Sequence, residues 1–459
     1  MTGRRQLARR LGELFPPERL HLDAADCIPY GYDNARVQAL PDAVVLAETE
    51  EEILALVQLC RELRTPLIAR GRGTGTTGAT VPTQGGIVLS LERMNRILEV
   101  NPDDRLMVVE PGVTNAAVQQ AAAKHGFFWA PDPTSSATCT VGGNLAYNSA
   151  GPRAVKYGTT RDHVLGLRAV TGRGELIRTG TRTTKGVVGY DLTRLLIGSE
   201  GTLAIITRAT LRLLPQPPCK RTLRALYRDM GSAARAVADI MAQPVTPCAL
   251  EFIDSAALDL VRDDIELPPE ARALLMIEVD GSEAAIDSDT RAVADAARNA
   301  GCIELRSAAS AQEAADLWAV RKALSPKQRQ IAPRKINEDV VVPVSRLPEL
   351  IEGIEALGRK HGIHIVNFGH AGNGNIHVNL LIDPDDPDQA RRAEACLDAI
   401  FDLVLELDGT LSGEHGIGLV KKQFVSRELG VSELEHMHAI RQAFDPDGIL
   451  NPGKALPDA

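Results

Sequence analysis

A glycine-rich loop that follows a short apolar run limits what the first part of this chain can fold into. Residues 73–78, GTGTTG, match the glycine spacing of the dinucleotide-binding fingerprint. That fingerprint needs a helix directly after the glycines, because the helix N-terminus holds the pyrophosphate. Residues 80–86, TVPTQGG, disfavour a helix, and the lysine of a phosphate-binding P-loop is also absent. The sequence therefore excludes a Rossmann turn and predicts a strand followed by a turn whose backbone N–H groups face an anion.

A second segment, residues 131–151, strengthens the case for a bound cofactor. It is long, nearly uncharged, and rich in glycine and small hydroxyl residues. Backbone of this kind can approach a large flat ligand closely while the hydroxyls hydrogen-bond it. Residues 156–158 and 198–202 have the same character. Together these segments predict a cofactor that carries phosphate.

Composition excludes several classes of protein. A chain of 459 residues is long enough for two or three domains. A net charge of −9 without a long basic run argues against a nucleic-acid partner. The seven cysteines are scattered, with no C-x-x-C pair, which excludes a cluster of the usual spacing and fits a reducing compartment. No apolar run reaches the roughly 20 residues of a transmembrane segment, so we expect a cytoplasmic protein.

The N-terminal residues 1–14 combine four arginines with regularly spaced leucines. We interpret them as a short solvated amphipathic helix. The alternative is a targeting or membrane-surface helix, which would place the protein peripherally at the inner membrane.

The pattern of predicted helices and strands changes at the linker 215–218, PQPP. Between the glycine loop and this linker, short strand-like runs alternate with Gly/Pro turns, interrupted by one helix near residues 116–125. After it, helical stretches alternate with strand-like runs that could form one antiparallel sheet. These helices are expected at 231–242, 282–300, 311–330, 346–361 and 386–407. The predicted fold class is α+β.

Two histidines on either side of a Gly/Asn-rich connection, His370 and His377, indicate a metal site. Glu414 and His415 follow later in the chain. Two imidazoles and a carboxylate suit Zn²⁺, although Fe²⁺ and Mn²⁺ accept the same ligands. Because the side chains of adjacent residues diverge, we assign Glu414 to the metal and His415 to the role of general base.

The connection between the histidines must be irregular for both to reach one ion. A five-residue hairpin loop would pair His370 with Ile376 and send His377 to the other face of the sheet. We therefore expect a six-residue connection or a bulge. Asn379 would share the face of His377 and bind substrate.

Seven motifs in order resemble one known family. They are the loop 73–78, the segment 131–151, KYG at 156–158, GSEGT at 198–202, the two-histidine hairpin, SGEHG at 412–416 and NPGK at 451–454. From about residue 38 onward the chain resembles the vanillyl-alcohol-oxidase-type flavoproteins. The similar branch contains the D-lactate, D-2-hydroxyglutarate and glycolate dehydrogenases.

The resemblance implies an FAD domain of two α+β subdomains, completed by the C-terminal tail, and a substrate cap with an antiparallel sheet. We expect an N-terminal helical segment over 1–37, the FAD domain over 38–216, the cap over 217–408 and the returning tail over 409–459. Relatives that attach FAD covalently often use a histidine in the glycine loop. None lies between Arg70 and Thr80, so we expect non-covalent FAD. The resemblance places cofactor contacts at Arg70, Gly71, Arg72, Gly73, Thr74, Gly75, Thr76, Pro131, Thr134, Thr138, Gly142, Gly143, Asn144, Asn148, Gly151, Gly201, Ile205, Ile206 and Asn451.

Candidate substrate contacts lie in the second half of the chain. Arg321 and Ser325 share a helix face, and the resemblance assigns them to the substrate carboxylate. A later basic residue is also implied. Arg334 and Lys335 are candidates, and we include Lys335 among the substrate contacts. Asn337 occupies the best-aligned position, which favours a monocarboxylic substrate.

These features predict an FAD-dependent, metal-assisted dehydrogenase of a D-2-hydroxy acid such as D-lactate. His415 would remove the hydroxyl proton while the hydride passes to the flavin. Alternatives within the class are a D-2-hydroxyglutarate dehydrogenase and a glycolate oxidase subunit, and outside it a non-redox FAD-dependent transferase. A cytochrome-type electron acceptor is expected, with a quinone and electron-transfer flavoprotein also open, and a homodimer is compatible with the sequence.

Overall fold

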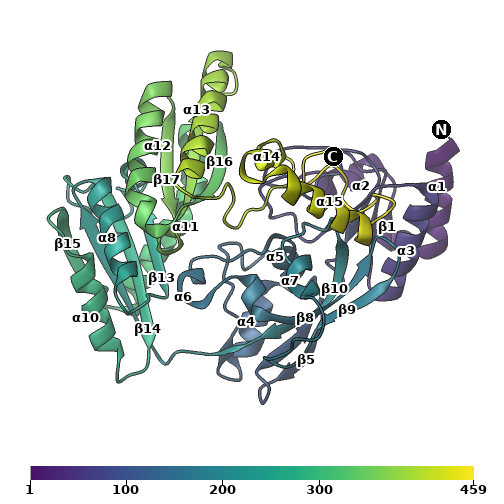
Figure 1. Ribbon diagram of the computed structural model, residues 1–459, viewed down its shortest axis with the longest axis horizontal. Helices are drawn as coiled ribbons and strands as arrows, with labels where there is room; N and C mark the ends of the chain where they lie inside the picture. The colour runs from purple at the N-terminus through teal and green to yellow at the C-terminus, as the bar shows by residue number, and fades with distance from the viewer. Residues whose placement is uncertain (1, 459) are drawn as a thin grey trace. The chain divides into compact units, whose positions relative to one another are not determined.

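The computed structural model describes residues 2–458, and the chain divides into two compact units (Figure 1). The first unit contains the residues up to Ala150, the stretch Gly158–Gln216, and the residues from Glu414 onward. The second unit contains Gly151–Tyr157 and Pro217–Gly413.

The first sheet of the first unit has the strand order β1-β2-β4-β3. Strands β2, β4 and β3 are parallel, and β1 is antiparallel to β2. Thr49 caps α3, because its Oγ1 accepts a hydrogen bond from the amide of Glu52 at 3.2 Å. The apolar side of α1, including Leu7 and Leu11, is buried in the same core as α3. The elements are α1 (Thr2–Leu14), β1 (Leu20–His21), α2 (Ala24–Cys27), β2 (Ala43–Leu46), α3 (Glu50–Leu63), β3 (Leu67–Arg70) and β4 (Ile87–Ser90).

The second sheet of this unit is antiparallel, in the order β5-β6-β10-β8-β9. The expected helix near 116–125 is α4, but the prediction of a single helix between the glycine loop and the linker was wrong. Thr140 caps α5 by accepting from the amide of Gly143 at 3.2 Å, and Asn148 ends it in the left-handed conformation. These caps allow a helix despite its two glycines. The elements are β5 (Ile97–Asn101), β6 (Leu106–Val109), α4 (Asn115–Ala123), β7 (Phe127–Phe128), α5 (Val141–Tyr147), β8 (Val164–Thr171), β9 (Leu176–Gly180), α7 (Leu192–Leu196), β10 (Ala204–Arg212) and β11 (Leu214–Pro215).

The second unit is built on a seven-stranded antiparallel sheet, in the order β15-β12-β14-β13-β17-β18-β16. Helices α8, α10, α12 and α13 pack on one another and on its strands (Figure 1). Helices α9 and α11 bury a separate apolar cluster against the strands, which includes Leu324 and Phe368. The strands are β12 (Cys219–Tyr227), β13 (Ala249–Ile253), β14 (Ala273–Gly281), β15 (Cys302–Ser307), β16 (Arg334–Val341), β17 (His364–Gly369) and β18 (Asn375–Ile382). The helices are α6 (Ala154–Tyr157), α8 (Met230–Ala242), α9 (Ser255–Asp259), α10 (Ile286–Ala297), α11 (Ala311–Ile331), α12 (Leu347–His361) and α13 (Pro387–Glu406).

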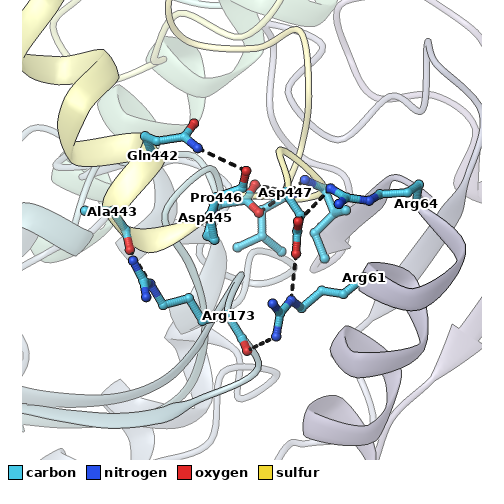
Figure 2. Close-up of polar contacts among 10 residues, drawn as sticks. Arg61, Arg64, Arg173, Gln442, Ala443, Asp445, Pro446 and Asp447 are labelled. Atoms are coloured by element: carbon cyan, nitrogen blue, oxygen red, sulfur yellow. Dashed lines mark hydrogen bonds and ion pairs between the residues drawn. The ribbon is translucent and has the colours of Figure 1, made fainter.

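The last stretch of the chain extends the first sheet of the first unit. The amide of Leu67 donates to the carbonyl of Ile449 at 2.8 Å, and the amide of Asn451 donates back to Leu67 at 2.9 Å. Figure 2 shows Arg61 of α3 and Arg64, the residue that ends this helix, bound to Asp447. The two hydrogen bonds are 2.7 and 2.6 Å long. Two helices precede this contact, α14 (Val425–Glu428) and α15 (Val431–Phe444).

The observed sheets confirm the expected α+β class, with a unit of two subdomains and a second unit with an antiparallel sheet. Among the described helices, none combines the length and the apolar character that crossing a bilayer requires.

Candidate functional site

The connection between His370 and His377 contains neither the six-residue connection nor the bulge that we expected. Phe368 pairs with His377 across β17 and β18, which excludes the simple five-residue loop. The chain makes one 3-10 turn at Ala371–Asn373, and Gly374 then adopts a left-handed conformation with φ of +73°. The expected irregularity was wrong, because the register of β17 and β18 continues without a shift up to Phe368 and His377, and a short 3-10 turn closes the hairpin. Because His370 lies two residues beyond Phe368, it shares a sheet face with His377.

The two imidazoles lie side by side in a buried position of the second unit. Their ring centroids are 5.1 Å apart and the ring planes are nearly perpendicular, at 86°. One nitrogen of each ring lies within 4.8 Å of a nitrogen of the other. Such a separation suits two ligands of one ion, whose bonds to imidazole nitrogens are about 2.0–2.1 Å long.

A buried carboxylate faces the Nδ1 atom of each histidine. Glu251 Oε1 lies 2.6 Å from His370 Nδ1, and Asp339 Oδ1 lies 3.4 Å from His377 Nδ1. An ionised carboxylate only accepts hydrogen bonds, so the His370 contact places the proton on Nδ1. In the neutral ring Nε2 then carries no proton, which is the state that a metal ligand needs. The donor set of the second unit therefore fits a divalent metal.

Asp339 also connects the histidines to the next motif along the chain. Its Oδ1 accepts from Asn375 Nδ2 at 2.7 Å, and its Oδ2 accepts from the amide of Gly413 at 3.0 Å. Gly413 directly precedes Glu414 in the sequence. Sequence reasoning missed Asp339 and Glu251. The available signal was an acidic residue inside a buried strand, since Glu251 occupies the centre of ALEFI at 249–253.

Arg321 of α11 joins this cluster through the same glutamate. Its Nε donates to Glu251 Oε2 at 2.7 Å, and its guanidinium carbon lies 4.5 Å from the centroid of the Phe368 ring. Its two terminal nitrogens, Nη1 and Nη2, make no hydrogen bond to any residue that the structure describes. Burial by itself would raise the pKa of Glu251, but the charges of His370 and Arg321 hold it below its ordinary value.

The other predicted substrate residues lie on α11 and on the neighbouring strands. Lys335 Nζ donates to Ser325 Oγ at 2.9 Å and to Gln328 Oε1 at 3.0 Å. Asn337 lies directly opposite Asn379 in the β16–β18 register. Asn379 is fully buried and its Nδ2 donates to the carbonyls of Val366 and His377, at 3.1 and 3.2 Å. Its Oδ1 has no hydrogen-bond partner among the described residues.

Glu414 and His415 begin the last stretch of the first unit. Glu414 Oε2 accepts from the amide of Ala150 at 3.1 Å, and the carbonyl of His415 accepts from Thr77 Oγ1 at 3.3 Å. Just beyond them, both oxygens of Glu200 accept backbone amides, from Ile417 at 2.6 Å and from Gly418 at 2.8 Å. Convergence of Glu414 and His415 with the two histidines stays a prediction.

Glu200 is a buried acid that the sequence reasoning did not single out within its GSEGT motif. Burial raises its pKa to about 7, against the lowering effect of the two amides and of Lys454. Burial also lowers the pKa of Lys454 to about 8. Asn451 connects the pair, because its Oδ1 accepts from Lys454 Nζ at 3.1 Å and its Nδ2 donates to the carbonyl of Glu200 at 2.7 Å.

A cavity in the first unit is lined by the glycine-rich segments. Seven residues predicted to contact the cofactor line it: Arg70, Gly71, Gly142, Gly143, Gly201, Ile205 and Ile206. Glu200, Thr140 and Tyr147 line it as well.

Two family models match the chain. One, described as FAD binding domain, matches residues 41–180, and the other, FAD linked oxidases, C-terminal domain, matches residues 216–455. The chain belongs to the FAD-linked oxidases. It is 38% identical to "Glycolate oxidase subunit GlcD" of Bacillus subtilis, over 98% of this chain and 96% of the relative. It is 35% identical to "D-lactate dehydrogenase" of Archaeoglobus fulgidus (97% and 98%) and 33% identical to "D-2-hydroxyglutarate dehydrogenase" of Stutzerimonas stutzeri (98% and 98%).

Solved structures support the fold of this FAD-linked oxidase. A p-cresol methylhydroxylase with substrate bound superposes with a TM-score of 0.81 at 18% identity, covering 100% of this chain and 98% of the other. The family and the fold together identify an FAD-dependent oxidoreductase.

The cavity of the FAD-linked oxidase fits a large flat cofactor at its glycines. A Cβ atom on Gly143 would meet only Thr140 Oγ1, at 3.4 Å, and one on Gly201 would meet only Ala69, at 3.9 Å. Larger side chains there would project into the cavity and fill it. Both glycines therefore keep space open where FAD is expected.

The remaining predicted cofactor residues lie outside the cavity lining. Asn148 caps α5, and Gly151 belongs to the second unit. Although Arg70 lines the cavity, its guanidinium is bound to Thr80 Oγ1 and to the carbonyl of Pro29, at 3.1 and 3.2 Å. The others outside the lining are Arg72, Gly73, Thr74, Gly75, Thr76, Pro131, Thr134, Thr138, Asn144 and Asn451.

The sequence grouped residues 156–157 with the cofactor segments, but in the structure they belong to the second unit and bind Asp280 of β14. Lys156 Nζ donates to the carbonyl of Asp280 at 2.8 Å, and the Tyr157 hydroxyl donates to Asp280 Oδ2 at 2.7 Å. These residues anchor the segment Gly151–Tyr157 to the end of β14 in the seven-stranded sheet.

Proposed function

We propose that this FAD-linked oxidase oxidises a D-2-hydroxy acid of the D-lactate type to the corresponding 2-oxo acid. The observation that carries the proposal is the buried cluster in which the Arg321 guanidinium and the His370 imidazole share one carboxylate, Glu251, with the His377 ring beside that of His370. A guanidinium suits the carboxylate of such an acid, and the imidazoles suit a metal that binds its hydroxyl. The names of the relatives support the same substrate class.

The proposed metal ligands are His370, His377 and Glu414, with Zn²⁺ as the ion. Support comes from the two adjacent imidazoles and from Asp339, which binds both the His377 side and the amide next to Glu414. When bound, the ion would act as a Lewis acid that lowers the pKa of the substrate hydroxyl.

The residues of the chain have separate roles in the proposed reaction. Arg321 binds the substrate carboxylate through Nη1 and Nη2, which other described residues leave unused. Asn379 accepts a hydrogen bond from the substrate through Oδ1, and His415 takes the hydroxyl proton as general base. FAD, held non-covalently in the glycine-lined cavity, supplies the acceptor for the Cα hydride.

A monocarboxylic substrate is preferred because Asn337, a neutral residue, occupies the strand position next to Asn379. A D-2-hydroxyglutarate dehydrogenase is the second candidate. The observation that favours it is the Lys335 ammonium, which binds Ser325 one helical turn from Arg321 and offers a charge for a distal carboxylate. Glycolate, which lacks the methyl group that lactate has on C2, is a third candidate substrate of the same class.

The electron acceptor would be a non-nicotinamide carrier, with a cytochrome as the first choice and a quinone or electron-transfer flavoprotein as the others. A non-redox FAD-dependent transferase is the proposal's rival outside this class. It differs in one measurable respect, because only a dehydrogenase reduces its flavin when it is mixed with the hydroxy acid alone.

The test is anaerobic stopped-flow mixing of the purified holoenzyme with D-lactate, L-lactate, glycolate and D-2-hydroxyglutarate, followed at 450 nm. We expect D-lactate to bleach the flavin fastest. His415→Ala should slow bleaching by about 10²–10⁴-fold at unchanged flavin content. His364→Ala is the matched control, because His364 is an exposed histidine at the start of β17. Absence of bleaching with every acid would contradict the dehydrogenase.

A further inference from the structure

Glu251 contacts both the proposed metal ligand His370 and the proposed substrate-binding residue Arg321. It lies at the centre of β13, is 0% exposed, and uses its two oxygens for different partners. Oε1 lies 2.6 Å from His370 Nδ1, and Oε2 lies 2.7 Å from Arg321 Nε. No other described residue contacts both side chains by hydrogen bond.

Each contact restricts its partner to one useful state. The contact with His370 keeps a proton on Nδ1 and fixes the plane of the ring, so that in the neutral ring Nε2 has a lone pair and a defined direction. The contact with Arg321 uses Nε and leaves the outer edge of the guanidinium, Nη1 and Nη2, for a planar anion. Phe368 supports the guanidinium from one side, with its ring centroid 4.5 Å from Cζ.

A single rigid carboxylate thus sets the distance between imidazole and guanidinium. A D-2-hydroxy acid has its hydroxyl and its carboxylate on adjacent carbons, so its two binding groups must be held at a fixed short separation. Two independently mobile side chains would lose conformational entropy when the substrate bound both.

Resting on the proposed function, we infer that Glu251 is a positioning residue. It holds the metal-binding imidazole of His370 and the carboxylate-binding guanidinium of Arg321 at a fixed position relative to each other. It contacts neither substrate nor flavin, and it acts through the two side chains that do.

The decisive variant is Glu251→Gln, which keeps the shape and removes the charge. An amide can still accept from one partner, but its NH₂ group then faces the other donor, so one of the two contacts is lost. Glu278→Gln is the matched control. Glu278 is also a buried glutamate of the same sheet, and it anchors α11 through Trp318 Nε1 at 2.8 Å, so it reproduces any loosening of that helix.

The main measurement is calorimetric titration of metal-free holoprotein with Zn²⁺, together with the melting temperature and the flavin content. We expect Glu251→Gln to weaken Zn²⁺ binding by about 10–100-fold, and Glu278→Gln to leave it within twofold. We also expect the KM for the most reactive hydroxy acid to rise in Glu251→Gln and not in the control. Equal Zn²⁺ affinity in Glu251→Gln and the unaltered protein would overturn the inference while leaving the proposed dehydrogenase intact.

A second measurement does not depend on how the variant folds. Long-range ¹H–¹⁵N spectra of the metal-free native protein report the tautomer of His370, with its signals assigned by their loss in His370→Asn. The inference requires the proton on Nδ1, and a proton on Nε2 alone would overturn it. Failure of the native protein to bind Zn²⁺ would overturn both this inference and the metal in the proposed function, and flavin bleaching would still report on the dehydrogenase.

Discussion

At the scale of single residues, Glu200 is the buried acid with the clearest consequence for pH dependence. Its pKa rises from an ordinary 4.5 to about 7, chiefly by burial. The native state therefore keeps a proton that the unfolded chain releases near pH 4.5, and it binds more protons between about pH 4.5 and 7. Stability from this group is accordingly full below pH 4.5 and falls as the pH rises toward 7.

Glu200→Gln should remove this dependence. We expect the melting temperature of the native protein, relative to that of the variant, to decrease from pH 5 to pH 7.5, by an amount that corresponds to at most ~3 kcal/mol. Melting both proteins across this range in buffers of matched ionic strength provides the measurement. A difference that does not change with pH would show that Glu200 is ionised throughout.

The sequence predicted the candidate metal ligands and the substrate-binding arginine, but it did not predict the acidic residues that hydrogen-bond and orient them. His370, His377 and Arg321 have recognisable spacing, whereas Glu251 and Asp339 are single acids within strands. Their partners depend on how β13, β17, β18 and β16 are aligned in the sheet. Strand order and register are properties of tertiary packing, so one sequence does not supply them.

At the scale of elements, the 3-10 turn between β17 and β18 decides whether the histidines share a face. Gly374 closes this turn at φ of +73°, and a Cβ there would lie 1.9 Å from the carbonyl oxygen of Val342. In Gly374→Ala the backbone of Val342 must therefore move, and the alanine must in addition adopt a strained, left-handed conformation. We expect a loss above the roughly 1–2 kcal/mol of the backbone term alone, together with weaker Zn²⁺ binding.

Gly362→Ala separates these two effects. Gly362 has a similar φ of +64° at the end of α12, but a Cβ there meets nothing within 4 Å. It should therefore show only the backbone term and leave Zn²⁺ binding unchanged. Thermal melts and Zn²⁺ titrations of both variants make the comparison. Equal losses of stability and of Zn²⁺ affinity would mean that Val342 moves without disturbing the turn.

The periodic elements were predictable and the capped short ones were not. The five helices expected after the linker are present as α8, α10, α11, α12 and α13. The short helix α5 was missed because its glycines lower helix propensity, and its stability comes from the caps at Thr140 and Asn148. Strand β16 extends over Arg334–Val341 because pairing with β18 continues over all eight of its residues, which depends on tertiary packing.

At the scale of the whole molecule, chain order and spatial order differ in two places. Residues 151–157 belong to the second unit although they lie between parts of the first. The residues from Glu414 onward return to the first unit. Short-range patterns carry no information about such returns, and only the resemblance implied that the tail completes the FAD domain.

The returning tail leads to the last prediction, because its final residues complete the core of the first unit. Ile449 and Leu450 are 3% and 0% exposed in the core that contains α3, and their backbone extends the sheet at Leu67. A chain ending at Gly448 would retain the Arg61–Asp447 contact of Figure 2 but lose these two side chains and Asn451.

Burial of two such side chains is worth roughly 3–6 kcal/mol, so this truncated chain should melt several degrees lower. It should also lose flavin on gel filtration, because Asn451 binds the carbonyl of Glu200 beside the cavity. A chain ending at Leu456 is the matched truncation, since it keeps every one of these contacts and removes an aspartate, Asp458, whose side chain is 89% exposed. Melting temperature and the flavin-to-protein absorbance ratio compare the two. Full flavin retention by the chain ending at Gly448 would mean that the sheet and its cavity form without the tail.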